Sequence, residues 1–171
     1  GEIRSQFGHV IDIAPTIYEI AGIPAPKTVN GIAQDPIEGT SLAYSFNDAN
    51  ATEKHNVQYF EMFGNRAIYQ DGWYARTIHK APYLPKAYNT FQEDVWELYN
   101  TQDDFSLTNN LAQQNPDKLK ALQDLFIQEG EKYHVLPLDD RTFERMNATA
   151  MSRPTIMEGR TSVTYSEGMK G

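Results

Sequence analysis

The chain has no cysteine among its 171 residues, which excludes disulfide bonds and metal sites built on thiolates. It also lacks a dense run of lysine or arginine, and its formal net charge is −8. Binding to a phosphate backbone depends on such basic clusters, so we expect no nucleic-acid partner. No apolar run approaches the roughly 20 residues that a membrane-spanning helix needs, and we expect no membrane partner either.

The composition that is present is typical of a globular protein. Hydrophobic residues make up 40% of the chain and charged residues 22%, and ten tyrosines, eight phenylalanines and two tryptophans need burial or a binding partner. The length fits one domain. The chain starts at Gly1, with neither an initiator methionine nor a signal peptide, which favours a segment from within a longer gene.

A first helix is predicted over residues 12–21. Asp12 is expected to cap the amides of the first turn, Pro15 stands where a missing N–H costs little, and Gly22 can adopt the left-handed backbone that ends a helix. The apolar side chains of this segment share one face that needs a partner surface: Ile13, Ile17, Ile20 and Ala21. Residues 23–37 are rich in proline, asparagine and glycine and are predicted to form a loop.

An antiparallel meander is predicted next, because aromatic and β-branched residues fill the segments 57–63, 66–69 and 73–78. The turn signals Gly64-Asn65 and Asp71-Gly72 separate these strands. Alternation of apolar and polar residues over 95–99 indicates a half-buried fourth strand.

A last helix is predicted over residues 116–133, after Asn115 and with Pro116 at its first position. Its apolar stripe fits against a sheet face and consists of Leu119, Leu122, Phe126 and Tyr133. The predicted fold class is therefore α+β, with a small antiparallel sheet of about four strands packed with a C-terminal helix. Beyond residue 134 the periodicity is weak, which predicts an extended C-terminal tail that needs another domain to lie on.

The segment 9–42 carries an ordered set of motifs that resembles a stretch late in the catalytic domain of arylsulfatases, members of the sulfatase family in the alkaline-phosphatase-like superfamily. The matching residues are Asp12, Pro15, Thr16, Ala21, Gly22, Pro24, Asn30, Gly31, Gly39, Ser41 and Leu42. Further family-like segments are 66–75, which looks like a hairpin beneath the active-site cleft, and 96–112, which looks like the entry to the last helix. Residues 135–141 resemble an extension of larger bacterial arylsulfatases, which implies a bacterial source.

The resemblance implies a division of the chain into three parts. Residues 1–50 would be the end of a sulfatase α/β domain, and the helix over 12–21 would lie at the edge of that missing domain. Residues 51–134 would be the C-terminal subdomain, with the meander and the last helix. Residues 135–171 would be an extended segment.

The resemblance also implies the chemistry of a larger parent enzyme. Sulfatases attack a sulfate ester with a hydrated formylglycine, and a divalent cation, usually calcium, polarises the sulfate. The formylglycine comes from a Cys or Ser in a Cys-x-Pro-Ser-Arg motif, and the only near match here, residues 152–155, has the wrong order. We therefore assign no catalytic residue and no metal ligand to this chain, and expect it to be inactive without its partner, the missing N-terminal α/β domain that would bind the sulfate-ester substrate.

Individual residues allow both functional and structural interpretations. His79 follows the strand over 73–78, where relatives bring a polar group toward the substrate pocket, so it is a candidate for the pocket rim, although an exposed histidine at the strand end is the favoured reading. His9, His55 and His134 share no ligand spacing with it and are expected to be solvated or packed in the core. The pair Asp139-Asp140 is expected to form a solvated acidic turn.

Two other function classes stay open on the sequence. The chain is compatible with a non-catalytic α+β binding or scaffold domain. It is also compatible with part of a related hydrolase that acts on phosphate or phosphonate esters, because the C-terminal subdomain discriminates these activities poorly.

Overall fold

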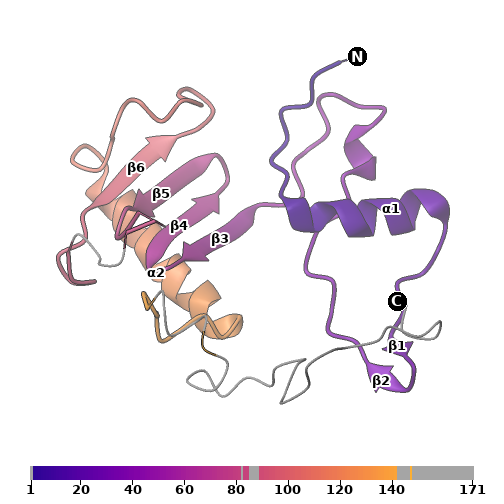
Figure 1. Ribbon diagram of the computed structural model, residues 1–171. Helices are drawn as coiled ribbons and strands as arrows, with labels where there is room; N and C mark the ends of the chain where they lie inside the picture. Colours follow the sequence, from indigo (N-terminus) through magenta and orange to yellow (C-terminus); the bar gives the residue numbers. More distant parts are fainter. Residues whose placement is uncertain (1, 82, 85–88, 142–146, 148–171) are drawn as a thin grey trace.

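The computed structural model describes residues 2–81, 83–84, 89–141 and 147 (Figure 1). The described elements follow one another along the chain as η1 (Val10–Asp12), α1 (Ile13–Ala21), β1 (Thr28–Val29), β2 (Ile32–Ala33), η2 (Ala43–Ser45), β3 (Val57–Met62), β4 (Asn65–Gln70), β5 (Trp73–Thr77), β6 (Trp96–Asn100) and α2 (Pro116–Lys132). The predicted α+β class is confirmed, with the four-stranded sheet and its C-terminal helix in the expected order.

The four long strands form one antiparallel sheet in the order β3-β4-β5-β6. Tight turns join the first three, and each turn has two successive residues with positive φ: Phe63 and Gly64 at 52° and 87°, Asp71 and Gly72 at 49° and 83°. Positive φ at both central positions matches the right-handed twist of a hairpin, which explains why the Asp-Gly signal was reliable.

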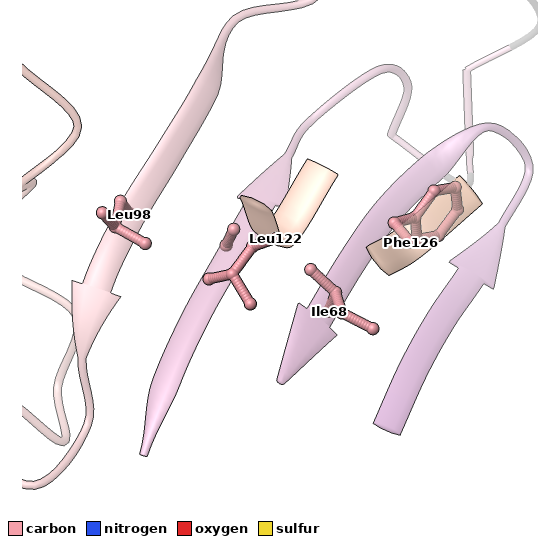
Figure 2. Packing of buried hydrophobic residues seen from close by; sticks show 5 residues of the cluster. Ile68, Leu98, Leu122 and Phe126 are labelled. Atoms are coloured by element: carbon pink, nitrogen blue, oxygen red, sulfur yellow. The ribbon is translucent and has the colours of Figure 1, made fainter. Parts of the chain in front are cut away.

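One face of the sheet carries the core, because α2 lies across it (Figure 1). Ile68, Ala75 and Leu98 occupy one row across β4, β5 and β6, and Leu122 and Phe126 of α2 meet them; all five are fully buried. Figure 2 shows Ile68, Leu98, Leu122 and Phe126 where α2 crosses the strands. The helix stripe predicted from its spacing therefore packs on the sheet as expected.

The opposite face of the sheet is covered in part by the N-terminal segment. Phe7 stacks on Tyr69 with ring centroids 3.9 Å apart, and His9 meets the edge of Phe60 at 5.4 Å. Alternation along the strands places Tyr69 on this second face, since it lies next to the core residue Ile68. The sheet is thus buried on both sides near β3 and β4.

Two local predictions need correction. The predicted loop over 23–37 contains a short hairpin, in which β1 and β2 pair around Asn30 and Gly31 at φ 50° and 82°. The first helix begins at Ile13, because residues 10–12 form a tighter 3-10 turn. Of the predicted extended tail over 135–171, only residues 135–141 and 147 lie within the described part of the chain.

Across the residues that the structure describes, none of the helices has both the length and the apolar character needed to cross a membrane.

Replacing Phe126 by alanine tests the core directly. Phe126 is fully buried, and truncation of a buried phenylalanine removes apolar contacts and leaves a cavity, so we expect the free energy of unfolding to fall by about 3–5 kcal/mol in a urea titration. Ile127→Ala is the matched control on the same helix. Because Ile127 is 45% exposed, its truncation should lower the free energy of unfolding by less than about 1 kcal/mol. Equal losses for the two variants would contradict this packing.

Candidate functional site

The carboxylate of Asp12 is the most heavily bonded buried group of the N-terminal part. It is fully buried and accepts hydrogen bonds from the backbone N–H of His9 at 2.8 Å and of Thr40 at 2.7 Å. The Nδ1 atom of His55 lies 2.8 Å from its Oδ2 atom. One side chain therefore connects three segments, namely η1, the stretch before η2 and the residues that lead into β3.

Thr16 and Gly39 complete the same arrangement. The hydroxyl of Thr16 donates to the carbonyl of Asp12 at 2.6 Å and accepts from the N–H of Leu42 at 2.8 Å. At Gly39 the backbone approaches η1 so closely that a Cβ atom would lie 2.0 Å from the carbonyl oxygen of Ile11. We call Asp12, Thr16, Gly39 and His55 the Asp12 clasp; three of its four members belong to the motif found in the sequence.

The clasp corrects the predicted role of Asp12. Its side chain makes no capping bond to the amides at the start of α1 and turns instead toward His9, Thr40 and His55. Burial by itself raises the pKa of this carboxyl, but the two backbone N–H groups and His55 outweigh it, so the pKa lies below its ordinary value. Asp12 is therefore a buried carboxylate that joins segments.

His79 lies at the end of β5 in a second buried cluster. Its ring is 1% exposed, stacks on Phe91 at 4.2 Å and places Nδ1 2.8 Å from the carboxylate of Asp94. On the other side, Nε2 lies 3.4 Å from a carboxylate oxygen of Asp140. The favoured reading of His79 as an exposed strand-end histidine is wrong.

Arg66 shares the carboxylate of Asp94 with His79. Its guanidinium is 5.5 Å from the ring centre of Phe91 and 5.3 Å from that of Trp96, and it donates to Asp94. Burial lowers the pKa of Arg66, and Asp94 acts in the opposite direction. Arg66, His79, Asp94 and Asp140 are called the His79 cluster below.

The His79 cluster also changes the interpretation of Asp139-Asp140. The carbonyl of Asp140 accepts a hydrogen bond from Nζ of the buried Lys80, and its carboxylate faces His79. Asp140 thus contacts two buried side chains, which the sequence did not predict, while its own side chain stays 40% exposed. The sequence carried no signal for this contact, because 60 residues separate Lys80 from Asp140.

The remaining histidines differ in their surroundings. His55 is buried in the Asp12 clasp and His134 is exposed, while His9 is half-buried. Among the described residues, no group of three or more histidine, aspartate or glutamate side chains could hold a metal ion. The described residues therefore offer no ligand set for the calcium ion that the resemblance implies, and the chain has no cysteine from which a formylglycine could form.

A cavity of about 730 Å³ follows strand β3. Its walls include the aromatic side chains of Tyr59, Phe60, Tyr74 and Tyr133 and the carboxylates of Glu38, Glu61 and Glu129. The two arginines that reach it are neutralised, because Arg66 pairs with Asp94 and Arg76 pairs with Glu97 at 2.7 Å. The cavity therefore suits an apolar or aromatic group better than a sulfate anion, and His79 is not among its lining residues.

Comparisons with known proteins found a curated relative that is named as a sulfatase and solved structures of similar fold. No family model matches the chain. An uncharacterized sulfatase of Schizosaccharomyces pombe is 29% identical over 147 residues, which are 84% of this chain and 25% of that protein. The chain thus spans about a quarter of the length of this curated relative.

Solved structures share the fold. Ps i-CgsB is 19% identical with a TM-score of 0.50, over 92% of this chain and 32% of that one. A weaker likeness, with 17% identity and a TM-score of 0.48 over 74% and 24% of the two chains, is to BT4656 in complex with its substrate D-glucosamine-2-N,6-O-disulfate. The curated relative confirms the resemblance to sulfatases that the motifs predicted, and the solved structure Ps i-CgsB shows that the fold is shared.

Replacing Asp12 by asparagine tests the clasp through its pH dependence. A carboxylate whose pKa is lowered by folding stabilises the fold above its unfolded pKa, and this contribution disappears as the pH falls through the folded value. At pH 7 we expect the variant to be less stable by about 2 kcal/mol, since hydrogen bonds to charged groups are lost. Below about pH 4 the difference should shrink, as urea titrations across the pH range would show. A difference that is constant with pH would contradict this role.

Replacing Asp94 by alanine tests the second cluster. The variant leaves the guanidinium of Arg66 buried without its carboxylate, and breaking such a pair costs about 3–5 kcal/mol of unfolding free energy. The neighbouring exposed acid supplies the control, since Glu93→Ala removes only its contacts with Thr90 at the surface. Both variants are compared by thermal and urea unfolding, and similar curves would show that the cluster is not a stabilising contact.

Proposed function

The chain resembles the C-terminal part of a sulfatase, and from this premise we propose that its parent is an arylsulfatase, an enzyme that hydrolyses sulfate esters. The observation that carries the proposal is the sequence identity of 29% over 147 residues with a sulfatase, of which the matched stretch covers 25%. The motif residues of the sequence also lie together in the structure, since Asp12, Thr16 and Gly39 meet in the Asp12 clasp.

The reacting groups are proposed to lie outside this chain. The resemblance implies that other parts of the parent would hold a formylglycine and a calcium ion, which would supply the nucleophile and charge stabilisation for sulfate-ester hydrolysis. The residues of this chain would shape and support the cleft instead. We therefore propose that the chain alone is inactive and that it has neither catalytic residues nor metal ligands.

The exposed apolar face of α1 supports the proposal that this chain contacts another domain. Ile13, Ile17 and Ile20 are each more than half exposed although they form one apolar stripe. Such a surface on one helix is unfavourable in water and is typical of a contact with another domain. We propose that this stripe packs on the missing N-terminal α/β domain, with residues 1–50 as the end of that domain, 51–134 as the C-terminal subdomain and 135–171 as an extended segment.

The His79 cluster is proposed to lie beside the substrate pocket of the parent. Because the ring of His79 is buried, its part would be to hold the segment around Asp140 in place rather than to contact the substrate. The acidic and aromatic cavity along β3 would then be covered by the missing domain and would not be the sulfate site.

The test uses an aryl sulfate such as 4-nitrophenyl sulfate with added calcium. The 171-residue chain should give no calcium-dependent turnover by itself, whereas the full-length parent should hydrolyse the substrate. In the full-length protein, Ile17→Asp should reduce activity at least tenfold, since a charge in the stripe disrupts the proposed domain contact at a cost of more than about 1.4 kcal/mol.

The matched control is Glu19→Ala, because Glu19 is exposed on the same helix but lies outside the stripe. Its activity should equal that of the unmodified parent. Calcium-dependent turnover by the 171-residue chain would overturn the proposed inactivity. A parent that hydrolyses phosphate or phosphonate esters but no sulfate ester would overturn the assignment as an arylsulfatase.

A further inference from the structure

The two edges of the sheet differ in how their backbone groups are bonded. At β6, the carbonyl of Leu98 accepts from the N–H of Leu111 at 2.8 Å, and the N–H of Leu98 donates to the side chain of Asn110 at 3.1 Å. At the other edge, no strand of the described residues pairs with the outer side of β3. An open edge is a template for a further strand unless lysine, proline or a bulge blocks it. β3 contains neither lysine nor proline, and its register with β4 is regular.

Hydrogen bonds to the neighbouring strand show which backbone groups of β3 face outward. The carbonyl of Asn56 accepts from the N–H of Asp71 at 3.1 Å, so this residue turns toward β4. Successive residues of an antiparallel strand alternate in this respect. Val57, Tyr59 and Glu61 therefore direct their N–H and C=O groups away from the sheet.

Only part of this outer row is bonded. The ring of His55 places Nε2 3.1 Å from the carbonyl of Val57, and the side chain of Gln58 donates to the carbonyl of Tyr59 at 2.6 Å. The N–H groups of Tyr59 and Glu61 and the carbonyl of Glu61 have no partner among the residues that the structure describes. An added strand would supply these partners.

The cavity described above follows this strand, since all six residues of β3 line it. On the face toward α2, Tyr59 stacks on Tyr133 with ring centroids 5.4 Å apart. On the other face, Phe60 meets Tyr74 at 6.1 Å. Because side chains alternate along a strand, an extended segment laid beside β3 would place successive side chains against both aromatic pairs.

The charges of the cavity favour a cationic side chain in that segment. Glu38 and Glu61 accept hydrogen bonds from a tyrosine hydroxyl at 3.1 Å and from a backbone N–H at 2.8 Å, which are neutral donors. Glu129 lies 3.8 Å from the exposed Lys132, and the two arginines of the cavity are already paired. A second copy of β3 would bring another Glu61 to the same place, and such like-charge contacts are unfavourable.

We propose that an extended segment of the parent from outside residues 1–171 adds to β3 as a further edge strand and places a lysine or arginine beside Glu61. The curated relative is matched over only 25% of its length, so most of a parent of that size lies outside this chain. The cavity is also lined by His9, Ile11 and Glu38, which belong to the part proposed as the end of the α/β domain. This contact rests on the missing domain proposed above and specifies how that domain joins the sheet.

Two short peptides test the edge on the 171-residue chain. The probes are acetyl-Thr-Val-Lys-Val-Thr-amide and the same peptide with glutamate in place of lysine. The lysine probe should bind saturably and slow hydrogen exchange at the amides of Tyr59 and Glu61 about tenfold or more in nitrogen-15 spectra, because bonded N–H groups are protected. The glutamate probe should bind about tenfold more weakly at low ionic strength.

Glu61→Gln isolates the charge, because glutamine keeps an acceptor for the N–H of Gly64. The preference for the lysine probe should fall about threefold or more in this variant. Glu131→Gln is the matched control, since Glu131 is exposed on α2 and does not line the cavity. Its preference should equal that of the unmodified chain.

Equal binding of the two probes, or exchange at Tyr59 and Glu61 that the lysine probe does not slow, would overturn the proposal. Protection of both amides without a probe would overturn it as well, because the edge would already be occupied, by a second copy if the chain sediments as a dimer. If Glu61→Gln fails to fold, the two probes on the unmodified chain decide by themselves. None of these measurements reads turnover, so failure of this contact and failure of the arylsulfatase assignment are separate results.

Discussion

A buried carboxylate imposes the main constraint on the N-terminal half of this chain. Removing the charge of Asp12 from water is costly unless hydrogen bonds and an opposite charge replace the lost hydration. Asp12 obtains them from His9, Thr40 and His55, three positions spread over 47 residues of sequence. The path of the backbone from η1 through η2 to β3 follows from this requirement, and Gly39 is needed where the backbone passes close to Ile11.

The C-terminal half is held together differently. Its stability comes from apolar burial between α2 and one sheet face, where Ile68, Leu98 and Phe126 exclude water completely. The Asp12–His55 pair joins this unit to the N-terminal half through polar bonds, and the stacking of Phe7 on Tyr69 adds an apolar contact.

The His79 cluster shows how a buried polar network can look catalytic. A histidine held by a carboxylate at Nδ1 is the arrangement that orients a general base. Here the second nitrogen faces Asp140 and the ring stacks on Phe91, so the ring has no position free for a substrate. The cluster instead fastens the segment after α2 to the end of β5, which fits a supporting subdomain better than a reaction centre.

The sequence alone determined the elements whose signals are local. The strand alternation, the Asp71-Gly72 turn and the stripe of α2 depend on neighbours within a few residues, and the ordered motifs were sufficient for the family resemblance. Contacts between distant residues were decided only by the tertiary structure. From the sequence, Asp12 was expected to cap a helix and His79 to lie at the surface. Their burial and their partners, 43 and 15 residues away, produce no periodic pattern in the sequence, so only the structure could reveal them.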